Sequence, residues 1–287
     1  MMRHLFSLAL IVVVSDASLQ AEDFRLRDET TTRHTLRFSG SGDRSLTVRN
    51  VNGSIRVTSS SSASVEIVVR RVVRADTRDD LRRGADETTL STADERPNVE
   101  AVVHDPRGYS CGEQRSVSER RRPQYSVEYD FTVSVPAGTR LNVCTINGGI
   151  EVVGTSGDFD VDNVNGRIKM TEVRGSGSAT TVNGAVQASF LDVPRQNSTF
   201  TTVNGGVTVT WPDSLSADLR LKTLNGGLFT DFDVQSLPAA PAVAPSRNNG
   251  RFVYRSNNSA NVRVGQGGPQ VTLESVNGDI RVLRASR

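Results

Sequence analysis

A short motif, Val-Asn-Gly or a close variant, recurs seven times along the chain, and each copy carries an aliphatic residue three places after the asparagine. On both sides of the asparagine, apolar positions alternate with polar ones. This period of two is typical of a β-strand with one buried face. Each repeat therefore predicts two short strands that meet at an Asn-Gly corner. We assign a structural role to the seven corner residues, which are Asn52, Asn147, Asn165, Asn183, Asn204, Asn225 and Asn277.

The spacing of the corners predicts how the repeats are arranged. Consecutive corners are 95, 18, 18, 21, 21 and 52 residues apart, and a period near 20 is typical of stacked repeats. We expect an all-β protein with a β-solenoid, or β-helix-like, stack of about seven coils. Equivalent side chains would then lie about 4.8 Å apart and could form hydrogen bonds along the stack. The alternative is an antiparallel β-meander or sandwich, in which Asn-Gly forms hairpin turns.

The residues beside each asparagine follow the repeat as well. The residue two places before it is Asn, Thr or Ser, and the residue directly before it is aliphatic in every copy. Because this aliphatic residue breaks the alternation, we expect the strand to bend there and to keep facing the core. Asn and Gly both tolerate positive φ, so we expect the pair to turn the chain.

A long insertion separates the first two copies. Its patterns predict strands at Ser64–Val73, Asn98–Val103 and Tyr125–Val135, and a short polar helix or loop at Asp76–Glu87. We expect these strands to cover the first end of the stack and the copy at Asn277 to cover the other end. The domain prediction is a signal peptide at 1–21, an N-terminal β region with the first coil and an Arg-rich insertion at 22–137, and a repeat region at 138–287 with a Pro-rich insertion at 236–249.

The N-terminal residues predict export. An apolar run from Leu5 to Val14 is followed by small residues, with cleavage expected after Ala17 or Ala21. Ten apolar residues are too few to span a bilayer, which takes about 20, and we expect no transmembrane segment. We therefore expect a periplasmic, cell-surface or secreted protein. In such an oxidising space Cys111 and the outward-facing Cys144 can form a disulfide, with two free thiols as the alternative.

The composition limits the chemistry. Aromatic residues are only 5% of the chain, so the core must be built from Val, Ile and Leu. The formal net charge of +2 gives no reason to expect a nucleic-acid partner. Only three histidines are present, and no zinc spacing, phosphate-binding loop or Gly-x-Ser-x-Gly motif occurs. We expect no catalytic residues, no metal and no cofactor.

Three groups of residues are weighed against this expectation. Asp158, Asp160 and Asp162 alternate on one strand and could form a calcium site or a pair of catalytic carboxylates. Their expected neighbours in adjacent coils are not carboxylates, so we favour a solvated face with an Arg140–Asp158 pair.

A Ser–His–Asp triad would have to use His34 or His104. Arginine runs could bind anionic glycans or headgroups, but acidic residues are interspersed with them. These arginines are Arg70, Arg71, Arg74, Arg82, Arg83 and Arg120–Arg122.

The repeats also resemble a known family. The segment Phe131–Gly157, the Asn-Gly copies that follow and the segment Gly267–Val282 resemble the bacterial putative-adhesin family of β-strand repeats, over roughly Leu36 to Leu283. The resemblance implies an all-β, often exported protein with an adhesive role, and it supplies no catalytic residues. The Arg-rich insertion and the Pro-rich segment depart from the family pattern.

These observations lead to one functional expectation with two alternatives. We expect an exported, non-catalytic adhesin or envelope binding or structural module that binds an envelope polymer or protein, with binding residues that the sequence does not identify. The alternatives are a β-helical polysaccharide-active enzyme and an envelope-stress sensor or regulator.

Overall fold

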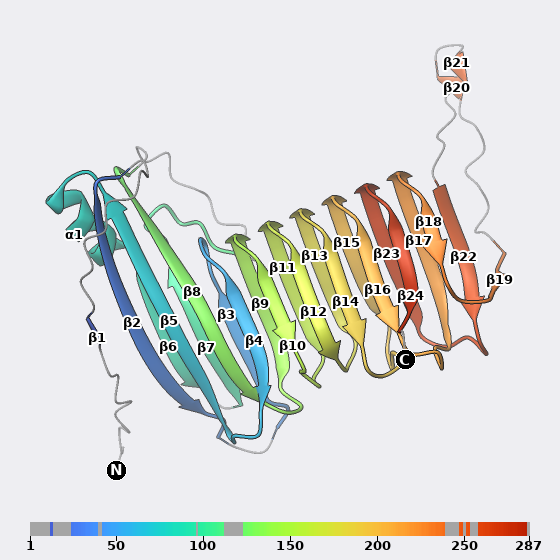
Figure 1. Cartoon of the computed structure of the whole chain (residues 1–287), viewed down its shortest axis with the longest axis horizontal. Coiled ribbons are helices and arrows are strands. Elements are labelled where there is room, and N and C mark those ends of the chain that lie inside the picture. Colours follow the sequence, from blue (N-terminus) through green and yellow to red (C-terminus); the bar gives the residue numbers. More distant parts are fainter. Residues whose placement is uncertain are drawn as a thin grey trace.

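The computed structural model of the 287-residue chain describes residues 24–39, 42–95, 97–111, 123–238 and 258–285, together with the pairs 12–13, 247–248 and 251–252. Nearly all of the predicted signal peptide, the Arg120–Arg122 run and most of the Pro-rich insertion lie outside the described residues. The described chain is an all-β protein with one short helix and two large mixed sheets that are not closed into a barrel (Figure 1).

The two large sheets hold eleven strands each. In spatial order, the first sheet contains β1 (Val12–Val13), β2 (Leu26–Arg37), β5 (Ser64–Ala75), β8 (Tyr125–Pro136), β4 (Ile55–Ser60), β10 (Ile150–Val153), β12 (Ile168–Val173), β14 (Val186–Phe190), β16 (Val207–Trp211), β24 (Ile280–Arg284) and β18 (Leu228–Thr230). The second sheet contains β19 (Val234–Ser236), β22 (Asn258–Val264), β17 (Ala217–Asn225), β23 (Gln270–Asn277), β15 (Ser198–Asn204), β13 (Gly177–Asn183), β11 (Phe159–Asn165), β9 (Arg140–Asn147), β3 (Ser45–Arg49), β7 (Asn98–His104) and β6 (Thr89–Glu95). The short strands β20 (Arg247–Asn248) and β21 (Arg251–Phe252) pair with each other.

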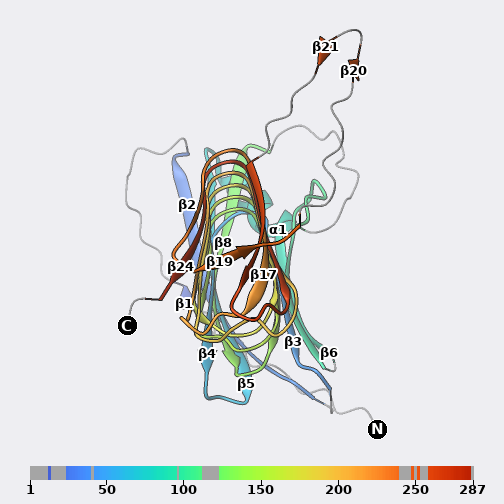
Figure 2. The same cartoon turned by 90° about the vertical axis from the view of Figure 1, so that its right-hand side faces the viewer.

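Each repeat contributes one strand to each large sheet, and equivalent strands of neighbouring repeats pair in parallel. In the first sheet Ile168 lies between Ile150 and Val186, its equivalents in the neighbouring repeats. Figure 2 looks along the stack and shows successive turns one behind another. The Asn-Gly corners are therefore not hairpin turns between antiparallel neighbours. Two sheets that enclose one core nevertheless fit the sandwich alternative.

The last repeat does not lie at the end of the stack, as we expected. Strand β23 pairs in parallel with β15 on one side and with β17 on the other, and β24 lies between β16 and β18. The copy at Asn277 is thus inserted between the copies at Asn204 and Asn225. At this end of the second sheet, β22 pairs antiparallel with β17, and β19 pairs with β22. The sequence prediction failed because a repeat motif carries no signal for its spatial order.

The other end of the stack is built from the insertion. The three strands predicted in the insertion are present. The prediction at Ser64–Val73 corresponds to β5, that at Asn98–Val103 to β7 and that at Tyr125–Val135 to β8. In the first sheet β2, β5 and β8 pair antiparallel, whereas β8 pairs in parallel with β4 of the first repeat. Helix α1 (Arg78–Glu87) follows Thr77, whose side chain accepts the Asp80 backbone N–H as an N-cap. We call β2, β5–β8 and α1 the head region, and the seven paired repeats the repeat stack.

One core runs between the sheets through both parts. Most of its members are Val, Ile and Leu, as the composition predicts. Near the middle of the repeat stack it also contains four aromatic rings in mutual contact. The Phe190 and Trp211 rings stack with centroids 5.3 Å apart, and Phe200 meets Trp211 edge-on at 6.1 Å. Phe159 completes this cluster at 6.4 Å from Phe200.

Candidate binding surface

The seven corner asparagines form a continuous ladder along one edge of the repeat stack. Six of the side-chain amides donate to the Oδ1 of the neighbouring asparagine on the head side, over 2.7 or 2.8 Å, and the seventh, Asn52, donates to the Val127 carbonyl. The side chains are exposed except at Asn52, which is half-buried. The spatial order is Asn52, Asn147, Asn165, Asn183, Asn204, Asn277 and Asn225. We call this row the Asn ladder.

A second row of hydrogen bonds lies inside the corners. The polar residue two places before each asparagine is buried, and it donates to the carbonyl of a glycine in the adjacent repeat. Thr202, for example, bonds to the Gly184 carbonyl at 2.7 Å, and Ser275 bonds to the Gly205 carbonyl at 2.8 Å. The other members are Thr145, Asn163, Thr181 and Thr223, while Asn50 at the head bonds to the carbonyls of Gly53 and Tyr129. These bonds satisfy backbone groups that would otherwise be buried without a partner.

The expected positive φ is found at the glycine of four corners, Gly53, Gly148, Gly166 and Gly205, and a second constraint acts on the corner glycines as well. A Cβ on Gly166 would lie 2.0 Å from the Gly148 carbonyl oxygen, and most other corner glycines meet the same obstacle. The stacked turns therefore approach each other too closely for any side chain. None of the corner asparagines has a positive φ. In the described chain, Glu172 is the one non-glycine residue with a positive φ. Close approach of backbones together with positive φ at glycine, and not positive φ at Asn, explains the motif.

In most copies the aliphatic residue before the asparagine points away from the core, which corrects the prediction from the sequence, whereas Val51 belongs to the core and Ile146 packs against it. The alternation continues to the corner, so the residue two before the asparagine is buried and the next one points outward. Val182, Val203, Val276 and Leu224 are 36–50% exposed, and Ile146 and Val164 are half-buried. Only Val51, at the head end of this row, is buried. We call the six outward residues the aliphatic stripe.

Two hollows adjoin the stripe. The hollow at the head end has a volume of about 430 Å³, and its lining includes Asn52, Asn147, Asn165 and Ile146. Tyr109 also lines it, with its ring exposed and the Arg107 guanidinium 4.7 Å from the ring centroid. The hollow at the other end also measures about 430 Å³, and it is lined in part by the stripe residues Val203, Val276 and Leu224.

Tyrosine and arginine side chains at the head hollow are fixed by carboxylates. Arg107 lies 2.8 Å from the nearly buried Asp105 carboxylate, and this hydrogen bond raises the pKa of Arg107. Tyr125 donates to Glu87, and burial together with this contact raises the pKa of Tyr125. These charges pair with one another, so the hollow offers Tyr109 and neutral amides to a ligand.

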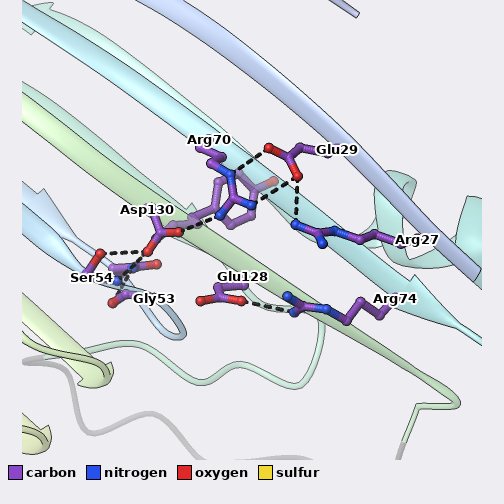
Figure 3. A network of polar contacts seen from close by, with 10 residues as sticks. Arg27, Glu29, Gly53, Ser54, Arg70, Arg74, Glu128 and Asp130 are labelled. Carbon is purple, nitrogen blue, oxygen red and sulfur yellow. Dashed lines mark hydrogen bonds and ion pairs between the residues drawn. The ribbon is translucent and has the colours of Figure 1, made fainter. Parts of the chain in front are cut away.

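The charged surface of the head region is also internally paired. Arg70 lies between two carboxylates, 2.6 Å from Glu29 and 3.2 Å from Asp130 (Figure 3). Its hydrogen bond lowers the pKa of Glu29. Asp130 also accepts the Ser54 backbone N–H at 2.9 Å, and Arg74 lies 3.0 Å from Glu128. Because these arginines are already paired with carboxylates, they are better described as part of a solvated, charge-neutral surface than as an anion-binding site.

Cys111 and Cys144 are joined in a disulfide, with their Cα atoms 5.7 Å apart. Cys144 lies on the outward phase of β9, as the sequence indicates, but it is buried beneath the loop that carries Cys111. The bond therefore ties the segment at the head hollow to the first contiguous repeat.

The aspartate row has the expected neighbours but not the expected ion pair. Asp160 lies between Asn142 and Ser178, and Asp162 lies between Cys144 and Thr180. Within the described part of the chain, Asp158 makes no ion pair with Arg140 and instead accepts the Ser176 backbone N–H at 3.0 Å. Burial and the neighbouring Asp160 raise the pKa of Asp162.

The two described histidines make local contacts. His34 lies 3.1 Å from the Thr32 hydroxyl, and burial lowers the pKa of His34. His104 lies 2.8 Å from the Ser91 hydroxyl on the exposed pair β6–β7. Among the hydrogen bonds of the described residues, no acidic side chain joins Ser91 and His104 to complete a triad.

Neither a metal cluster nor a membrane-spanning helix is found among the described residues. They contain no group of three or more His, Cys, Asp or Glu side chains that could hold a metal ion, and the expectation of no metal stays a prediction. Across the same residues, no helix is long and apolar enough to cross a membrane.

Comparison with known proteins gives weak likenesses. No family model and no curated protein matches the chain. A putative cell adhesion protein from Clostridium sporogenes has a similar solved structure, with 10% identity, a TM-score of 0.44 and coverage of 91% of this chain and 100% of its own. A putative adhesin from Bacteroides fragilis has 7% identity, a TM-score of 0.25 and coverage of 89% and 97%. Both likenesses are too weak to carry an argument, and the family resemblance of the sequence stays a prediction.

Sequence reasoning identified the corner asparagines and the cysteine pair but missed the aliphatic stripe and the head hollow. The sequence did contain a signal for the stripe. The aliphatic residue before each asparagine is out of phase with the inward-facing positions of its strand, so strict alternation would place it on the outward face. The hollow could not be found, because Tyr109 and Arg107 come from a loop without a repeat pattern.

Proposed function

We propose that the protein is an exported, non-catalytic binding module of the adhesin type whose repeat stack is a short β-solenoid. The observation that carries the proposal is the exposed, uncharged strip formed by the Asn ladder and the aliphatic stripe. Contiguous exposed apolar side chains mark interaction surfaces in soluble proteins. Here the six stripe residues run beside the row of seven amides, which is about 29 Å long at 4.8 Å per step.

Rigidity supports a binding role. Every repeat is fixed to the next by a ladder amide bond, by a buried side-chain bond and by the strand hydrogen bonds of both sheets. A surface that is already ordered loses little conformational entropy when it binds. The parallel, in-register pairing of one strand per repeat in each sheet supports the solenoid description.

The disulfide supports export, because such bonds persist in oxidising compartments. The non-catalytic part of the proposal is supported by the aspartate row, whose carboxylates face amide and hydroxyl neighbours instead of one another. No observation favours the stress-sensor alternative over binding.

The proposal is tested with purified, oxidised protein carrying a fluorescent label. Sedimentation with envelope fractions should show saturable binding that unlabelled protein displaces. The same preparation is incubated with neutral and acidic glycans, and the reducing ends released are counted. Absence of saturable binding would contradict the proposal, as would glycan turnover that is lost on Asp160→Asn.

A further inference from the structure

We propose that the strip formed by the Asn ladder and the aliphatic stripe binds an uncharged polysaccharide chain that lies along the repeat stack. The inference rests on the proposed binding function and names the class of its ligand. Three properties of the strip support it: the hydrogen-bonding capacity of the ladder, the apolar row beside it and the absence of charge in both rows.

The ladder offers a donor and an acceptor at every step. An asparagine side chain has two N–H donors and an oxygen with two lone pairs. In an interior member such as Asn183, the ladder uses one N–H toward Asn165 and one lone pair for Asn204. The exposed amide keeps one of each for a ligand. A hydroxyl group both donates and accepts hydrogen bonds, so a hydroxyl-rich polymer can bond to the N–H groups and to the oxygens of the ladder. A purely anionic ligand only accepts, so it would bond to the N–H groups alone.

The aliphatic stripe supplies the apolar half of the strip. Each of its residues directly precedes a ladder asparagine, so the two rows run side by side with the same step of about 4.8 Å. Sugar rings present C–H faces as well as hydroxyl edges. A saccharide chain on the strip can therefore cover methyl groups and bond to amides at the same time, which water alone cannot do.

Charge favours an uncharged chain. Neither the ladder nor the stripe contains an ionisable side chain. Beside the far end of the stripe, Lys222 lies opposite Glu274 in register, so the two charges offset each other. Arg167, exposed two places after Asn165, has no equivalent cation at the same place in the other repeats, whereas a site for an acidic polymer would need a row of cations.

The ends of the strip indicate how a chain would be bounded. The head hollow joins Ile146 and three ladder residues to the exposed ring of Tyr109, which can stack on a terminal sugar. The far hollow is lined by the last three stripe residues. A linear ligand can thus run from one hollow to the other.

The test uses affinity electrophoresis in native gels that contain galactomannan, hydroxyethylcellulose or, as the anionic comparison, polygalacturonate. The binding variant is Val182→Glu with Val203→Glu, which places two charges on exposed stripe positions of β13 and β15. The matched control is Gln187→Glu with Thr208→Glu, on the outward face of β14 and β16 in the same two repeats. We expect a neutral polymer to retard the wild type and the control equally, and the affinity of the binding variant to fall at least about tenfold.

Three results would overturn the inference. They are no retardation by either neutral polymer, equal loss in the control, and a dimer in light scattering that disappears with Val182→Glu and Val203→Glu, since that dimer would make a second copy the occupant. If neutral polymers fail while envelope binding remains saturable, the ligand class is wrong and the binding function stands. If both fail, the proposed function falls as well.

Discussion

The head region and the repeat stack continue the same two sheets with different chemistry. In the head region, long strands pair antiparallel, and unlike residues face each other, as in the pairs of Arg70 with Glu29 and Arg74 with Glu128. In the repeat stack, strands pair in parallel and equivalent positions lie side by side. A column of one charged residue type would repel itself there. Asparagine avoids this, because one neutral side chain carries both donor and acceptor.

The comparison also separates two ways of filling space. At the glycine positions, the repeat corners leave no room for a side chain, since a Cβ there would meet a neighbouring carbonyl. At the head hollow, the disulfide between Cys111 and Cys144 of β9 instead holds the segment that carries Arg107 and Tyr109. Stability in the stack should therefore depend on backbone approach and small neutral groups, and stability in the head region on packing and paired charges.

The largest effect is expected at a stacked corner. Gly166→Ala would place a Cβ 2.0 Å from the Gly148 carbonyl oxygen, and both backbones are held by ladders. We expect a loss of more than about 4 kcal/mol in the free energy of unfolding, measured by urea denaturation. The control is Gly138→Ala between β8 and β9, where a Cβ meets nothing within 4 Å and φ is +75°. Its cost should stay near 1 kcal/mol, and equal costs would refute the close-approach explanation.

The next effect tests the inserted last repeat. Leu273 on β23 is fully buried between β15 and β17, so Leu273→Ala should cost about 2–5 kcal/mol. Phe229 on β18, at the end of the first sheet, is half exposed, and Phe229→Ala should cost less than about 1 kcal/mol. The reverse ranking in thermal or urea unfolding would contradict the burial of Leu273 inside the stack.

A smaller effect is expected for the buried donors. Thr202→Val removes the hydroxyl that bonds to the Gly184 carbonyl and should cost about 1–3 kcal/mol. The adjacent outward residue gives the matched control, and Thr201→Val should change the free energy of unfolding by less than about 0.5 kcal/mol. Indistinguishable variants would show that the inner row of bonds contributes nothing net.

The smallest effect concerns Asp162, the aspartate beside the disulfide. Burial and Asp160 raise its pKa in the folded state, so the folded protein binds the proton more tightly than the unfolded chain. Stability contributed by this group is present below its ordinary pKa of 3.8 and is lost as the pH rises through the folded value. Asp162→Asn should therefore stabilise the protein at pH 7 by less than about 1 kcal/mol, with the gain vanishing below pH 3.8. A gain that persists at low pH would assign the effect to something other than charge.

The sequence predicted what repeats and missed what does not. Alternation predicted a strand at Tyr125–Val135, and in β8 the alternate residues Val127, Phe131 and Val133 are buried. Period alone cannot order the copies in space, so the position of the Asn277 repeat was wrong. The repeat period also does not show whether an aliphatic residue at a corner faces inward or outward, so the aliphatic stripe was not predicted. The expected Arg140–Asp158 pairing was wrong, and the Asp158 carboxylate accepts the Ser176 backbone N–H instead.

In-register parallel stacking, with the Asn277 repeat inside the stack, is the central claim and can be tested by cysteine cross-linking. Thr208 lies directly opposite Arg281 on the outward face of the first sheet, and Arg281 lies opposite Phe229. Strands two steps apart are separated by about 9.6 Å, beyond the 7 Å limit for a disulfide between Cα atoms. Oxidation of Thr208→Cys with Arg281→Cys should therefore give a cross-linked peptide in mass spectrometry, and Thr208→Cys with Phe229→Cys should not. A cross-link in the second variant and none in the first would contradict the account.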